Sequence, residues 1–158
     1  MAVKLGFEDF IRQVEEGTAE MVKELHKLLT EKGCALEVKE AKSGYVVSYT
    51  LNKKTLLNYV FRKKGLIIRI YAGHICDYME LLDTLPKGME KAVAGAPVCK
   101  RLINPEACNS KCPMGYDFIM KGERYQKCRY SAFMFLVCEE NLPFIRQMLE
   151  QELNAFTN

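Results

Sequence analysis

The sequence has no glycine-rich phosphate-binding loop, because the patterns GxGxxG, GKS and GKT are all absent. It has no apolar window long enough to span a bilayer. It also lacks the apolar run behind a basic start that is typical of a signal peptide. The net charge is only +3 over 158 residues, which is too small to indicate nucleic-acid binding from the total alone. We therefore expect a cytoplasmic protein with no membrane partner.

Cysteine, in contrast, is abundant and clustered. The chain has seven cysteines, an odd number, and no secretory features, which favours reduced thiols over a disulfide framework. Four of them follow the spacing Cys99-x8-Cys108-x3-Cys112-x15-Cys128. Zinc prefers four ligands in a tetrahedron, and thiolates serve well. The sequence therefore predicts a zinc site made by Cys99, Cys108, Cys112 and Cys128.

Two other interpretations of the same cysteines stay open. Cys112 is followed by Pro113, as in some ferredoxin loops, so an iron–sulfur cluster is an alternative, although the spacing fits no standard cluster motif. The thiols could instead be free, or two of them could form a disulfide. In that case cationic neighbours would make them reactive and favour a redox sensor. We expect Cys34, Cys76 and Cys138 to behave as small buried apolar residues.

Positive charge collects in the same stretch. Between residues 99 and 130 seven basic residues outnumber three acidic ones, which gives +4 in a chain of +3. Four thiolates around a divalent ion leave two excess negative charges, and nearby cations would offset them. We expect this charge either to balance the thiolates or to meet a partner.

Apolar spacing predicts an α+β fold in a single domain, residues 1–158, with a cysteine-rich loop and hairpin over 95–130. We expect a two-layer domain in which one curved, mainly antiparallel sheet of about five to seven strands packs against the first and last helices. The first expected element is a helix over 7–32, which Gly17 could kink or break. A four-strand meander over 34–72, two short helices over 77–94, a hairpin and a central strand over 116–137, and a helix to about residue 154 follow.

No catalytic constellation stands out. His74, Cys76 and Asp77 lie close together in the sequence, but without the context of a cysteine nucleophile, so we assign no catalytic residue. His74 could replace one cysteine as a metal ligand. The lysine pairs 53–54 and 63–64 lie in predicted turns between tyrosine-bearing strands, which leaves single-stranded nucleic acid as an alternative partner.

The run Gly44 to Tyr49, the runs 55–61 and 66–72, and the closing 133–137 strand with its helix resemble small bacterial α+β proteins of the YdhG and YjbR (MmcQ-like) kind. This resemblance implies the architecture and carries over no functional residue. The cysteine stretch departs from the pattern. We predict a metal-stabilised binding module for a small molecule or a protein partner, non-enzymatic, with a thiol-based redox or metal sensor and a nucleic-acid-binding domain as alternatives.

Overall fold

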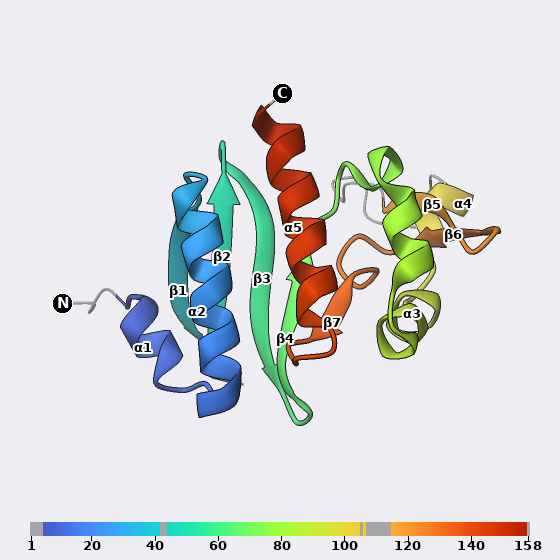
Figure 1. Ribbon diagram of the computed structural model, residues 1–158. Helices are drawn as coiled ribbons and strands as arrows, with labels where there is room; N and C mark the ends of the chain where they lie inside the picture. The colour runs from blue at the N-terminus through green and yellow to red at the C-terminus, as the bar shows by residue number, and fades with distance from the viewer. Residues whose placement is uncertain (1–4, 42–43, 105, 107–114, 158) are drawn as a thin grey trace.

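The computed structural model describes residues 5–41, 44–104, 106 and 115–157 and shows an α+β fold (Figure 1). Its helices are α1 (Phe7–Ile11), α2 (Glu16–Glu31), the 3₁₀ helices η1 (Ile75–Asp77) and η2 (Met79–Thr84), α3 (Lys87–Ala94), α4 (Lys100–Ile103) and α5 (Leu142–Thr157). Its strands are β1 (Ala35–Ala41), β2 (Gly44–Leu51), β3 (Lys54–Arg62), β4 (Gly65–Ile70), β5 (Tyr116–Met120), β6 (Glu123–Lys127) and β7 (Met134–Leu136).

Strands β1 to β4 form the predicted antiparallel meander, which β7 extends in the order β1-β2-β3-β4-β7. The register places Val47, Tyr59 and Ile68 in one row across the sheet, and all three are fully buried. Helices α1, α2 and α5 lie over one face of this sheet (Figure 1). The structure thus confirms the strands that the period-two alternation predicted, because apolar residues at every second position share one buried face.

The predicted helix over 7–32 is two helices, and the break lies between Ile11 and Glu16, before the expected position at Gly17. Because of this break, α1 and α2 pack against the sheet separately. Phe10 of α1 packs against Tyr59 at 5.4 Å and against Phe61 at 5.9 Å between ring centroids. Helix α2 then buries its own apolar stripe of Ala19, Val22, Leu25 and Leu29.

The main sheet has five antiparallel strands, as predicted, but β5 and β6 do not join it and form a separate two-stranded sheet. After β6 the chain turns, and the N–H groups of Ser131 and Ala132 both donate to the Cys128 carbonyl. This turn separates β6 from β7, so the two are not continuous. The apolar run 131–137 forms only the three-residue β7 at the edge of the larger sheet, not a central strand.

The helices after β4 and β7 lie close to the predicted positions. Pro86 is the N-cap residue of α3, where its missing N–H leaves no helical hydrogen bond unmade. Asn141 precedes α5, and its carbonyl accepts the N–H groups of Phe144 and Ile145. Across the part of the chain that the structure describes, no helix combines the length and the apolarity needed to cross a membrane.

His26 joins α2 to the sheet and to α1. Its Nδ1 lies 2.8 Å from the Tyr49 hydroxyl, and its ring stacks on Phe7 with 3.9 Å between ring centroids. Burial lowers the pKa of His26 below its usual value, and the nearby Glu8 charge opposes this shift only in part. The folded state therefore favours the neutral imidazole.

This shift predicts that His26 reduces stability as the pH falls. An imidazole titrates near pH 6.5 in the unfolded chain. Because the folded pKa is lower, the unfolded state binds the proton more readily below that pH, and unfolding becomes easier. We expect the urea midpoint of the native protein to fall more than that of His26→Gln between pH 8 and pH 5.5. Equal falls in the two proteins would exclude His26 as the cause.

Candidate functional site

The two ends of the cysteine stretch lie side by side. An isolated antiparallel bridge joins Val98, in the segment that enters α4, to Lys127, at the end of β6. The Cys99 N–H donates to the Gln126 carbonyl at 2.8 Å, and the Cys128 N–H donates to the Pro97 carbonyl at 2.8 Å. In such a ladder Cys99 and Cys128 lie on the same face as diagonal neighbours. The fold thus brings together two of the four predicted ligands.

The environment of Cys99 suits a metal-bound sulfur. Cys99 is buried, and its Sγ accepts the Gly115 N–H at 3.3 Å. Backbone N–H groups aimed at sulfur stabilise thiolate ligands and hold them in place. Cys128 is half-buried. These two thiols are the kind of donor that zinc takes in proteins.

The other two predicted ligands, Cys108 and Cys112, lie outside the described residues. Within the described ranges no three histidine, cysteine, aspartate or glutamate side chains gather as a metal-ligand group. Cys99 and Cys128 are both free thiols, so no disulfide joins them. The Nδ1 of His74 lies 3.1 Å from the carboxyl group of Glu152 on α5, and the role of His74 as a substitute metal ligand stays a prediction.

Most of the described cations of the stretch have partners of their own. Lys127 is buried, and its Nζ donates to the carbonyls of Ala94 and Ala96 at 2.8 Å each, which joins β6 to the end of α3. Arg124 pairs with Asp117 across the β5–β6 hairpin, and Lys121 pairs with Glu90 of α3 at 2.8 Å. Arg129 instead lies over the rings of Tyr71 and Tyr116. Lys121 and Lys127 thus join the small sheet to α3, and the Arg124–Asp117 pair joins its two strands.

The three remaining cysteines are separate from this site. Cys34 is buried, as expected, and Cys138 is half-buried. The prediction that Cys76 is buried is wrong, because its thiol is exposed and donates to the Asp117 carbonyl at 3.4 Å. Residues 75–77 form η1 against the hairpin, which turns this side chain outward.

His74 belongs to a second polar cluster, centred on Glu152 of α5. The Glu152 carboxyl group is 1% exposed and accepts three hydrogen bonds, from the His74 N–H at 3.1 Å, the His74 Nδ1 at 3.1 Å and the Tyr78 hydroxyl. Burial first, and then the Glu152 charge, raise the pKa of Tyr78 far above its usual range. The Tyr78 hydroxyl therefore remains protonated and acts as a donor.

Sequence reasoning missed Glu152 because it lies 78 residues from His74. A signal did exist, since Glu152 continues the apolar stripe of α5 through Ile145, Met148 and Leu149 at helical spacing. A carboxyl group at a core position needs buried donors. The cavity beside the cluster has a volume of about 360 Å³, and its lining contains no thiol and no serine or threonine hydroxyl. We interpret the cluster as a structural tie between α5 and the β4–η1 connection.

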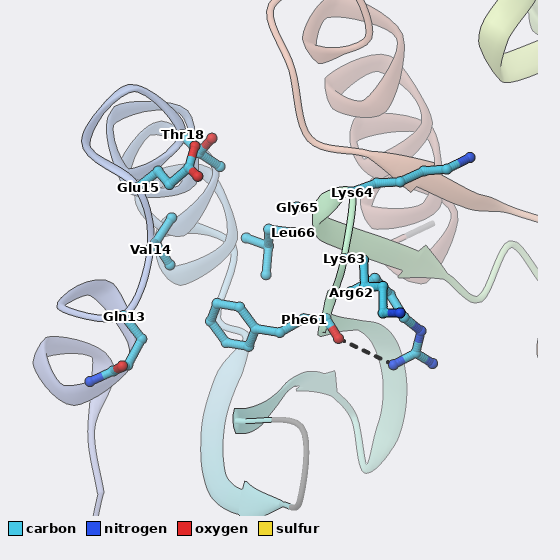
Figure 2. A pocket seen from close by; sticks show the side chains of 10 residues that line it. All are labelled: Gln13, Val14, Glu15, Thr18, Phe61, Arg62, Lys63, Lys64, Gly65 and Leu66. Atoms are coloured by element: carbon cyan, nitrogen blue, oxygen red, sulfur yellow. Dashed lines mark hydrogen bonds between the residues drawn. The ribbon is translucent and has the colours of Figure 1, made fainter.

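Figure 2 shows another cavity, of about 230 Å³, between the α1–α2 connection and the β3–β4 turn. Val14, Phe61 and Leu66 point into it, whereas the Lys64 side chain extends away. The lysine pairs 53–54 and 63–64 lie at opposite ends of β3, roughly 25 Å apart at the rise of a strand. Tyr49 and Tyr59 are fully buried and are not available to stack on bases. The half-buried Tyr45 and Tyr71 are the tyrosines of these strands that keep exposed surface, and a nucleic-acid partner stays a prediction.

Comparison with known proteins gives no assignment for this chain, since no family, no curated protein and no solved structure matches it.

Proposed function

We propose that this protein is a non-enzymatic binding module whose 95–130 segment is held by one zinc ion. The zinc would be bound by Cys99 and Cys128 at the paired ends of the segment and by Cys108 and Cys112 between them. The observation that supports this proposal is the pairing at Val98 and Lys127, which places Cys99 and Cys128 on one face although 28 residues separate them in the sequence.

The zinc would have a structural task. Four thiolates close a tetrahedral site and leave no open position for substrate, so the ion would tie the loop between α4 and β5 to the ladder at its base. The larger sheet with α1, α2 and α5 on one face would form the two-layer domain that carries this segment. In a cytoplasmic setting the thiols would stay reduced and able to bind metal.

The proposal is tested by elemental analysis and visible absorption of anaerobically purified protein. We expect one zinc per chain, no visible band, and a lower melting temperature after chelation. Cys128→Ser should lose most of the zinc on dialysis, whereas Cys138→Ser, a control at a half-buried cysteine outside the stretch, should keep it. Metal-free protein from anaerobic cells would contradict the proposal, and a brown protein containing iron would replace zinc with a cluster.

A thiol-based redox sensor is the second candidate, favoured by the free and partly exposed thiol of Cys128 beside Cys99. In that case mild peroxide would link the two cysteines, and the mass of the chain would fall by two hydrogens. Bound zinc would protect both thiols, so resistance of the zinc-loaded protein to peroxide supports the structural site.

A further inference from the structure

A polar cavity of about 360 Å³ lies directly after Cys128 in the chain. It is lined by Lys54 and Thr55 at the start of β3, by Tyr71 just after β4, and by Arg129 and Tyr130 after β6. Its volume is at the lower end of the range for small-molecule sites. All five lining residues belong to the described part of the chain, and none of them is acidic.

Arg129 is held by aromatic rings rather than by carboxyl groups. Its guanidinium carbon lies 5.4 Å from the centroid of the Tyr71 ring and 5.6 Å from that of Tyr116. Within the described residues Arg129 makes no hydrogen bond and no ion pair with the protein. A cation over a ring is stabilised through the face of the ring, which uses none of the five N–H donors of the guanidinium. These donors therefore remain for a ligand.

The rings that hold Arg129 are themselves fixed. The Tyr71 hydroxyl donates to Asn58 Oδ1 at 2.8 Å, and Asn58 Nδ2 donates to Ser48 Oγ at 2.7 Å, so a chain of hydrogen bonds across β2 and β3 orients the Tyr71 ring. Tyr116 is buried at the start of β5. The guanidinium is thus preorganised, which reduces the entropy lost when it binds an anion.

The rest of the cavity adds a second cation and an exposed ring. Lys54 is exposed at the start of β3, so the cavity carries two positive charges, those of Lys54 and Arg129. Tyr130 is 42% exposed and meets Tyr71 edge to face, with 6.0 Å between ring centroids. An exposed aromatic ring beside paired cations is suited to a flat ligand body next to its anionic group.

We propose that this cavity binds a small molecule with an oxyanion, a phosphate or a carboxylate, on an aromatic body. Arg129 donates two parallel hydrogen bonds to the oxyanion, Lys54 adds charge, and the Tyr130 ring packs against the aromatic part. This assignment rests on the proposed binding function, because it names the ligand class of the same module. It also links the zinc to ligand binding, because a zinc ion that fixes Cys128 would also fix the position of the adjacent Arg129.

The test is isothermal titration calorimetry of the full chain with phenyl phosphate, benzoate, inorganic phosphate and phenol, each to about 10 mM. We expect one site for phenyl phosphate or benzoate, and the tighter of the two identifies the oxyanion. Inorganic phosphate and phenol should bind at least about tenfold more weakly, because each lacks half of the ligand. Failure of both aromatic anions to bind, or equal binding by phenol, overturns the proposal.

Variants locate the site. Arg129→Gln should weaken binding at least about tenfold, since it removes a charged hydrogen-bond donor. Lys54→Gln, at an exposed position at the start of β3 where folding is not at risk, should weaken it about threefold. Arg12→Gln makes the same charge change on an exposed side chain beyond α1 and should bind as the native protein does. Unchanged binding by Lys54→Gln and Arg129→Gln overturns the assignment.

Zinc measured on the same samples separates the two proposals. Native protein with one zinc and no affinity for either aromatic anion contradicts the cavity alone. Metal-free native protein that still binds the anion through Arg129 contradicts the zinc tie alone.

Discussion

Replacing Glu152 with alanine is expected to lower the free energy of unfolding by about 3 to 4 kcal/mol. The change leaves three donors without their acceptor, the His74 N–H, the His74 Nδ1 and the Tyr78 hydroxyl, and Tyr78 is buried. An unsatisfied buried polar group costs about 1 to 3 kcal/mol, and water can reach the partly exposed His74 but not the Tyr78 hydroxyl. For a chain of this size the melting temperature should fall by roughly 10 °C.

Glu150→Ala is the matched control on the same helix. Its carboxyl group is about half exposed and pairs with Arg146 at 2.9 Å. Exposed pairs of this kind contribute at most about 1 kcal/mol, so the control should unfold close to the native protein in urea. Glu152→Gln keeps one carbonyl acceptor and should fall between the two. A melting temperature of Glu152→Ala equal to that of Glu150→Ala would contradict the structural tie.

The strands were predictable because their physical signal is local. Residues at every second position of a strand, such as Val47 and Tyr49 of β2 or Leu57 and Tyr59 of β3, are fully buried and lie on one face of the sheet. The division into two sheets was not predictable, since it depends on the turn after Cys128, where Ser131 and Ala132 bond back to one carbonyl. The composition of the 131–137 run fits a long strand, and tertiary pairing with β4 leaves only three residues in the ladder.

The candidate sites differ in the same way. The spacing of the cysteines indicated a shared site, but the pairing of Cys99 with the end of β6 is a long-range contact that no local pattern encodes. Arg129 was visible only as one charge of the +4 stretch. Its role depends on Tyr71 and Tyr116, which come from two other segments of the chain. The sequence thus indicated which types of residue form the candidate sites, whereas their contacts depend on the fold.

Replacing Gly115 with alanine is expected to open the base of the cysteine stretch and to reduce zinc affinity at least about tenfold, through overpacking of the ladder. A Cβ at this position would overlap the Lys127 carbonyl oxygen and would lie 2.9 Å from the Cys99 Cβ. The carbonyl belongs to backbone and cannot rotate away, so the segment with Gly115 must move off β6. That movement also breaks the bond from the Gly115 N–H to Cys99 Sγ. We expect a loss of about 3 kcal/mol in urea unfolding as well.

The two glycine variants, compared at equal zinc concentration, separate an effect on the site from an effect on the chain. Gly88→Ala in the exposed first turn of α3 meets no atom within 4 Å, so it should keep native zinc content and stay neutral or gain up to about 1 kcal/mol. Glu152→Ala should lose stability and keep its zinc, because its cluster lies outside the Cys99–Cys128 ladder. Gly115→Ala should lose both. Native zinc affinity in Gly115→Ala would show that the metal does not depend on the pairing of Cys99 and Cys128, and would leave the x3-spaced pair Cys108 and Cys112 to bind it with other ligands.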